Sequence, residues 1–226
     1  MDSAPGKPAS QRPHVFAIVP AAGRSQRMGS PKQLIEVAGR PLLVSVAERL
    51  AAADVSGVLV VTRSEIAAAI GLDESNRETR TGVRPMAALV HVVINDDPAT
   101  EMIDSVRIGV RWWAAQTAPA SDDGYLVCPA DHAGISSADV SACVAAYRAA
   151  SDSIIVAAYR GRRGHPLIFP ATLADFVYSN ACAAGLNALP RAHPARVKLV
   201  ECGSASVVDD VDTPADLQQF ARRAHP

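Results

Sequence analysis

The sequence predicts an α/β fold in which helices cover a mostly parallel sheet. Short apolar runs rich in Val and Ile alternate with stretches whose apolar residues recur every three to four positions, as they do where strands alternate with helices. Several of these runs end directly in small or acidic residues, and ligands bind at the carboxyl ends of parallel strands. The 226 residues can form one sizeable core, so we expect a single domain over residues 14–226 after a disordered tail over residues 1–13.

The expected strands are short, apolar and rich in β-branched residues. The first, Val15–Val19, has no polar residue, which indicates a strand that is buried on both faces. The strands that follow it are expected at Gly57–Thr62, Leu89–Asn95, Tyr125–Cys128, Ile154–Ala158, Leu167–Phe169 and Arg196–Glu201.

The expected helices lie between these strands. One begins at Pro41 and places Leu43, Val46 and Leu50 on a single face. Ser136 with Asp139 three residues later resembles a capping box at the start of another helix. The remaining helices are expected at Glu65–Ile70, at Met102–Gln116, at Ala171–Tyr178 and from Thr213-Pro214 onward.

The composition excludes several classes of protein. A net charge of −1 argues against a nucleic-acid binder with a broad basic surface. No run of 18 or more apolar residues occurs, so no membrane span is predicted. The first 13 residues have no apolar core of the kind found in signal peptides. The cysteines show no metal-binding spacing, so we expect them to be buried free thiols and the protein to be cytoplasmic. The four cysteines are Cys128, Cys143, Cys182 and Cys202.

The loop after the first strand has the composition of a phosphate-binding site. Pro20–Gly23 is a run of small residues that leaves the backbone accessible, and the cations Arg24, Arg27 and Lys32 follow it. Backbone N–H groups and cationic side chains are the groups that bind phosphate oxygens. The Walker and G-x-G-x-x-G patterns are both absent, so a plain connector with solvated cations remains the alternative.

Three further stretches are candidate sites. Asp131 directly follows an expected strand, where it could bind a metal ion or cap a turn. The carboxylates of Asp209–Asp212 could surround a cation or lie solvated at a helix N-terminus. The basic, Gly-containing loop Arg160–Pro166 could hold an anionic substrate or be an exposed hairpin turn.

Three segments carry a family resemblance. The pattern from Val19 to Leu34, V-P-A-A-G-R-S-x-R-M-G-x-P-K-Q-L, with Gly39-Arg40-Pro41 after it, resembles the signature of the MobA-like nucleotidyltransferases. Tyr159–Phe169 is similar to a segment of the molybdenum cofactor cytidylyltransferase branch. Asp210–Leu217 resembles the closing motif of the family.

The resemblance implies a fold and a reaction. The fold is a Rossmann-like three-layer α/β/α sandwich with a mostly parallel sheet, of the nucleotide-diphospho-sugar transferase type. The implied reaction moves a nucleoside monophosphate, CMP being favoured, from a nucleoside triphosphate to a phosphorylated acceptor such as molybdopterin and releases pyrophosphate. CTP is the favoured nucleotide, GTP is the other possibility, and Mg²⁺ or Mn²⁺ is the implied cofactor.

The resemblance also implies roles for individual residues. The catalytic residues would be Arg24, Lys32 and Asp131. Nucleotide-binding residues would be Ala21, Ala22, Gly23, Arg24, Ser25, Lys32 and Ser105. Metal ligands would come from Asp131, Asp210 and Asp212, and acceptor-binding residues from Arg162, Gly164 and His165.

Three alternatives remain at this point. The guanylyl branch and the methylerythritol phosphate cytidylyltransferases share parts of the first motif, although Asp131 lacks the Asp-Ala-Ala-Arg-Pro context of the second group. The family usually has Gly-Asp-x-Pro around the metal-binding Asp, whereas this chain has Ala130-Asp131-His132-Ala133. A non-catalytic nucleotide-binding accessory protein is therefore the alternative from another class.

Overall fold

The computed structural model describes residues 12–23, 31–37, 39–71, 89–132, 134–211 and 216. Among the predicted site residues, Arg24, Ser25 and Asp212 lie outside the described residues, as does the helix start expected at Thr213. No helix in the described ranges has the length and apolar character needed to cross a membrane.

The strand pattern builds a mostly parallel sheet. In the described residues its seven strands lie in the order β5-β4-β1-β6-β8-β7-β9. Their bounds are β1 Val15–Pro20, β4 Gly57–Thr62, β5 Val90–Ile94, β6 Gly124–Val127, β7 Ile154–Tyr159, β8 Arg162–Pro170 and β9 Val197–Glu201. Only β8 runs antiparallel to its neighbours β6 and β7, and β2 (Glu36–Val37) and β3 (Arg40–Pro41) form a separate small hairpin. The carboxyl ends of β1, β4, β6 and β7 consequently meet at one edge of the sheet.

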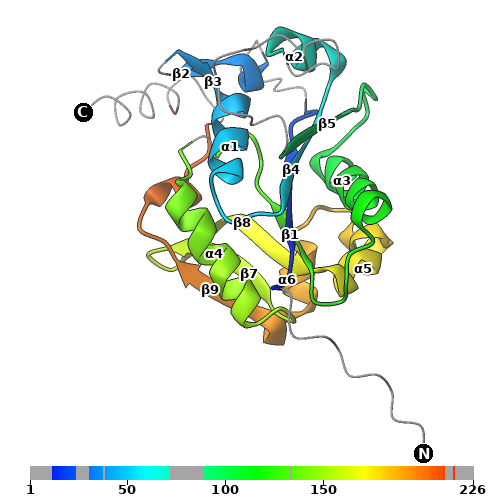
Figure 1. Ribbon diagram of the computed structural model, residues 1–226, viewed down its shortest axis with the longest axis vertical. Coiled ribbons are helices and arrows are strands. Elements are labelled where there is room, and N and C mark those ends of the chain that lie inside the picture. The colour runs from blue at the N-terminus through cyan, green and yellow to red at the C-terminus, as the bar shows by residue number, and fades with distance from the viewer. Residues whose placement is uncertain are drawn as a thin grey trace, which may run out of the picture.

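Helices cover both faces of this sheet, as Figure 1 shows. Val15, Ala17 and Val19 of β1 pack on the face covered by α1 (Leu42–Ala51) and α4 (Ser137–Ala149). Phe16 and Ile18 pack on the opposite face. That face is covered by α3 (Met102–Thr117), α5 (Ala174–Tyr178) and α6 (Ala188–Ala192), and α2 (Ser64–Ala69) follows β4. The result is the predicted three-layer α/β/α sandwich.

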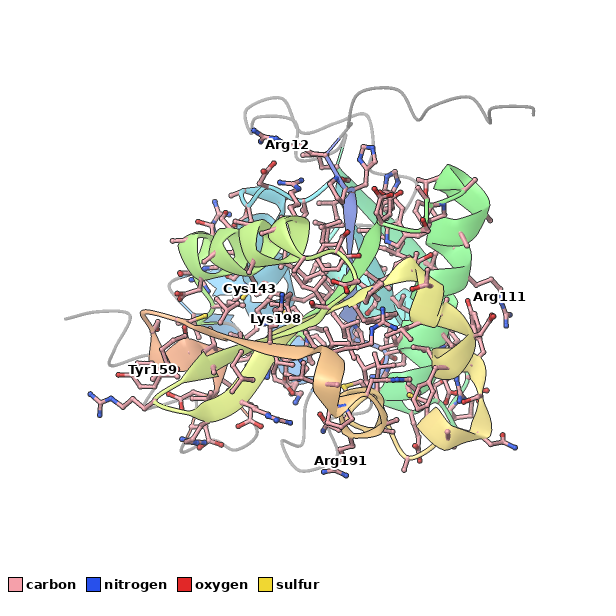
Figure 2. All side chains as sticks on the ribbon, turned by 90° about the horizontal axis from the view of Figure 1, so that it is seen from below. Arg12, Arg111, Cys143, Tyr159, Arg191 and Lys198 are labelled. Carbon is pink, nitrogen blue, oxygen red and sulfur yellow. The ribbon has the colours of Figure 1, made fainter. Side chains whose placement is uncertain are left out.

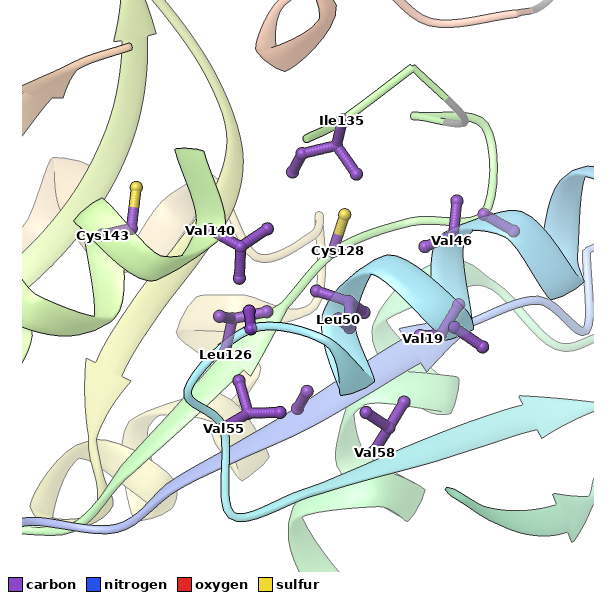
Figure 3. Packing of buried hydrophobic residues seen from close by; sticks show 14 of the residues in the cluster. Val19, Val46, Leu50, Val55, Val58, Leu126, Cys128, Ile135, Val140 and Cys143 are labelled. Carbon is purple, nitrogen blue, oxygen red and sulfur yellow. The ribbon is translucent and has the colours of Figure 1, made fainter. Parts of the chain in front are cut away.

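The core explains why the first strands could be recognised. All six residues of β1 and of β4 are buried, because helices press on both sides and no position of either strand faces water. Leu50 of α1 and Val140 of α4 pack with Val19 and Leu126 in one apolar cluster (Figure 3). Burial of apolar surface stabilises such a cluster by about 25 cal/mol per Å², and here it holds β1 and β6 side by side beneath the site.

The predicted hairpin turn in Arg160–Pro166 is confirmed, but the extent of the predicted loop was wrong. Only Arg160 and Gly161 form the turn, both at positive φ, 50° and 76°, while β8 already begins at Arg162 and runs to Pro170. Tyr159 pairs with Arg162 across the resulting hairpin. The outer residues of β8 are exposed there, so charged and Gly residues are tolerated in a strand whose inner half is apolar.

Candidate active site

The carboxyl ends of β1 and β6 open onto a pocket of about 200 Å³. Its lining residues come from the ends of these strands, from the short 3₁₀ helix Lys32–Leu34 (η2) and from the start of α3. They are Pro20, Ala21, Ala22, Gly23, Lys32, Gln33, Met102, Ser105, Pro129, Ala130 and Asp131. The predicted residues Ala21, Ala22, Gly23, Lys32, Ser105 and Asp131 are thus brought together in one place.

Lys32 and Asp131 contact each other directly across this pocket. Lys32 Nζ lies 2.7 Å from Asp131 Oδ2, and the two side chains are 18% and 20% exposed. Burial by itself raises the pKa of Asp131, but the nearby Lys32, with smaller contributions from His132 and His165, outweighs burial and holds that pKa below its usual value. Asp131 is therefore an ionised carboxylate, held by a neighbouring cation.

The second oxygen of Asp131 fits a metal ion. Asp131 Oδ1 is buried and has no hydrogen-bond partner among the described residues, and the ring nitrogen Nε2 of His132 lies 3.9 Å from it. Val211 N donates a hydrogen bond to the Asp131 carbonyl at 3.1 Å, which brings the backbone next to Asp210 alongside Asp131. The described residues contain no group of three or more His, Cys, Asp or Glu side chains that could hold a metal. Mg²⁺ is commonly held by only one or two carboxylates, together with water and substrate phosphates.

Gln33 is a pocket residue that the sequence did not single out. Its side chain is 2% exposed, and its Nε2 donates to the carbonyls of Ala21 at 3.0 Å and Gly23 at 2.9 Å. Thr62 Oγ1 also donates to the Ala21 carbonyl, at 3.4 Å. Nothing in the spacing of the sequence reveals these contacts, although the position of Gln33 directly after Lys32 was available as a signal.

His132 and His165 form a pair beside Asp131. Their ring centroids are 4.7 Å apart, and His165 Nδ1 lies 3.4 Å from the Val127 carbonyl. Burial, with a smaller contribution from His132, lowers the pKa of His165 to about 4. At neutral pH His165 is consequently uncharged. His132 was not predicted as a site residue.

The lowered pKa of His165 predicts a pH dependence of stability. The unfolded chain binds a proton on this histidine below pH about 6.5, whereas the folded protein binds it only below about 4. The free energy of unfolding should therefore fall as the pH is lowered from about 6.5 to 4, by up to about 1.4 kcal/mol per pH unit. Urea unfolding at several pH values, on wild type and His165→Asn, measures this. The variant should show a smaller slope in this window, and equal slopes would contradict the assignment.

The predicted acceptor-binding residues do not line the pocket formed by the described residues. Arg162 is exposed beside the turn of the β7–β8 hairpin. Figure 2 shows that the base of this turn, marked by Tyr159, and the helix α3, marked by Arg111, are on opposite sides of the molecule. At Gly164 a Cβ would overlap the carbonyl oxygen of Val207, so close backbone packing is sufficient to explain this glycine.

Comparison with known proteins identifies relatives along most of the chain. The family model of the MobA-like NTP transferase domain matches residues 17–197. Nicotine blue oxidoreductase of Paenarthrobacter nicotinovorans is 29% identical over 210 residues, which are 89% of this chain and 93% of that protein. The 2-C-methyl-D-erythritol 4-phosphate cytidylyltransferase of Nocardia farcinica is 34% identical over 116 residues, 50% of this chain and 42% of that enzyme.

The fold has solved counterparts. The structure of Rv0371c from Mycobacterium tuberculosis H37Rv superposes with a TM-score of 0.70 at 21% identity, covering 94% of this chain and 100% of that one. The same protein in complex with manganese superposes with a TM-score of 0.64 at 19% identity, with the same coverage. At these identities the likeness concerns the fold, which is that of the nucleotide-diphospho-sugar transferases.

Proposed function

The chain belongs to the family of MobA-like NTP transferase domains, and from this premise we propose that it transfers CMP from CTP to a phosphorylated acceptor such as molybdopterin. As a member of this family it is an enzyme of the nucleotidyltransferase class. One observation carries the proposal: those predicted nucleotide-binding residues that the structure describes line a single pocket, in which Lys32 and Asp131 are 2.7 Å apart.

The chemistry requires positioning and charge more than covalent help from the protein. An oxygen of the acceptor attacks the α-phosphorus, the bond to the bridging oxygen breaks, and pyrophosphate leaves with the electron pair. Lys32 is the cation that neutralises charge on the leaving phosphates, together with Arg24, which lies outside the described residues. Ala22 and Gly23 offer backbone N–H groups to the same phosphates, whereas the N–H of Ala21 donates to the Val61 carbonyl at 2.8 Å.

A divalent cation, Mg²⁺ or Mn²⁺, fits the residues present. Asp131 would hold it through Oδ1, which is buried and has no hydrogen-bond partner in the described part of the chain, together with Asp210, or with Asp212, which lies outside that part. When bound, the cation supplies a positive charge next to the reacting phosphate. The manganese complex of the M. tuberculosis protein supports a divalent metal.

CTP is favoured over GTP by the Ala21-Ala22-Gly23 form of the first loop, and the cytidylyltransferase from Nocardia farcinica supports this choice. A phosphorylated acceptor is consistent with the name of that relative, and molybdopterin is favoured by the resemblance of Tyr159–Phe169. We propose that the acceptor binds outside the pocket itself, beyond the carboxyl end of β6, where Arg162, Gly164 and His165 lie in the first half of β8. A guanylyl-type molybdopterin transferase and a methylerythritol phosphate cytidylyltransferase-like enzyme remain the neighbouring alternatives.

Nucleotide binding should stabilise the protein, and Lys32→Ala should remove this effect. A ligand that binds only the native state adds about 2.7 kcal/mol at a hundredfold excess over Kd. Thermal unfolding with Mg²⁺ and each of CTP, GTP, ATP and UTP should give the largest shift with CTP. Lys198→Ala, at an exposed lysine on β9, is the matched control and should respond like wild type. A CTP shift of full size in Lys32→Ala would exclude Lys32 from the phosphate site.

A second candidate function comes from the oxidoreductase relative, which matches nearly the whole chain. A pocket that binds a triphosphate could also bind the pyrophosphate of a nicotinamide dinucleotide, whose hydride would reduce an aromatic acceptor. Two assays distinguish these two functions. Pyrophosphate release with CTP and an acceptor supports transfer, whereas oxidation of NADH or NADPH with a quinone-like acceptor supports reduction. Nucleotide binding with neither reaction would indicate the accessory protein.

A further inference from the structure

The first loop is held from inside the protein by one side chain. Gln33 belongs to η2, directly after Lys32, and its amide is almost completely buried. It donates to two loop carbonyls, those of Ala21 and Gly23, at 3.0 and 2.9 Å. A primary amide has two N–H donors, so a single side chain satisfies carbonyls on both sides of Ala22.

Because the Ala21 carbonyl is held, the geometry of the peptide bond also fixes the direction of the Ala22 N–H. In a trans peptide the C=O of one residue and the N–H of the next point in opposite directions. Gln33 holds the Ala21 carbonyl at 3.0 Å, whereas the Thr62 hydroxyl contacts it only at 3.4 Å, so Gln33 is the main anchor and the N–H of Ala22 is directed away from both side chains. Ala22 lines the pocket, and within the described residues its N–H donates to no acceptor. It is therefore an amide donor held in place before any ligand binds.

We propose that Gln33 is a positioning residue that fixes the Ala22 amide, and with it the first loop, for the phosphate groups of the nucleotide. This inference rests on the function proposed above and adds to it the residue on which the phosphate subsite depends. Gln33 acts through the backbone, and it also ties the loop to Lys32, because the two residues are neighbours in η2. Backbone and side-chain donors to the phosphates are thereby held by one buried amide.

The test separates phosphate binding from general stability. Gln33→Met keeps the length of the side chain and removes both hydrogen bonds. Titration calorimetry should show inorganic tripolyphosphate binding to it about ten- to hundredfold more weakly than to wild type, as expected when a hydrogen bond to a charged group is lost. Binding of cytidine, which has no phosphate, should not change. A purely structural role would lower the melting temperature and leave the tripolyphosphate affinity as it was.

Thr62→Val is the matched control. Thr62 is also buried and donates to the same Ala21 carbonyl, so the variant removes a hydrogen bond at the same place and leaves both Gln33 contacts. It should keep the affinity for tripolyphosphate. Equal weakening in Thr62→Val and Gln33→Met would overturn the specific role of Gln33.

Two further outcomes are distinguishable. Wild-type affinity in Gln33→Met overturns this inference and leaves the proposed function standing, whereas a wild type that binds neither CTP nor tripolyphosphate overturns both. If Gln33→Met does not fold, amide hydrogen exchange on wild type decides. The Ala22 amide should become protected when tripolyphosphate binds, and unchanged exchange at Ala22 would overturn the proposal.

Discussion

Asp131→Asn is expected to lower kcat/KM for nucleotidyl transfer by about 10²- to 10³-fold, the range measured when one preorganised charge contact is removed from an active site. The substitution keeps the shape of the side chain. It removes the charge that pairs with Lys32 at 2.7 Å and weakens Oδ1 as a ligand for a divalent cation. Both losses act where negative charge must be balanced as pyrophosphate leaves.

Two measurements identify the cause of the expected loss in Asp131→Asn. Binding of Mn²⁺, followed by electron paramagnetic resonance in the presence of CTP, should weaken in parallel with turnover. Asp139→Asn is the control, because Asp139 is also buried but accepts hydrogen bonds from Ser136 and from Gly203 N away from the pocket. The control should lose stability and keep kcat. Turnover near that of wild type in Asp131→Asn would remove Asp131 from the metal site.

Gly164→Ala is expected to lower the free energy of unfolding by about 3 kcal/mol, the upper part of the usual range for overpacking. A Cβ at this position would overlap the carbonyl oxygen of Val207 and crowd the side chain of Val208. Val207 is itself buried in the 3₁₀ helix Ala205–Val207, so moving its backbone away from the new Cβ would cost free energy. The clash would push the segment after β9 away from β8.

Gly203→Ala provides the comparison for this prediction. A Cβ at Gly203 meets nothing closer than Asp139 Oδ1, at 3.8 Å, and its N–H bond to Asp139 does not require glycine. Urea unfolding should therefore show a small change for Gly203→Ala and a large one for Gly164→Ala. A stable Gly164→Ala protein that has lost only the affinity for its acceptor would instead favour the binding role that the family resemblance implied.

The sequence predicts best where burial alone decides the structure. β1 and β4 are buried along their whole length because helices cover both faces, and the carboxyl ends of the parallel strands β1 and β6 share an edge. That edge was enough to bring Lys32 and Asp131 into one predicted site. The outer half of β8 could not be predicted, because Arg162 and Arg163 become strand only by pairing with Tyr159 and Ala158 of β7.

Contacts between particular atoms also could not be predicted from the sequence. The ion pair of Lys32 and Asp131 joins η2 to the end of β6, and only the assembled sheet sets the distance between these elements. The contacts of Gln33 could not be predicted either, since a buried amide that bridges two carbonyls leaves no periodic pattern in the sequence. Gly164 was predicted to lie in a loop and to contact the acceptor, yet the approach of the Val207 backbone is sufficient to account for it.

The hydrogen bond from Val211 N to the Asp131 carbonyl bears on when the site can be completed during synthesis. A chain growing on the ribosome contains β1, η2 and β6 well before Val211 is added. The backbone at Asp131 can therefore gain this partner only after Val211 has been made. A chain that stops before Val211 would carry the pocket residues but lack the contact that joins Asp131 to the segment containing Asp210, so the site is completed only when this segment has been made.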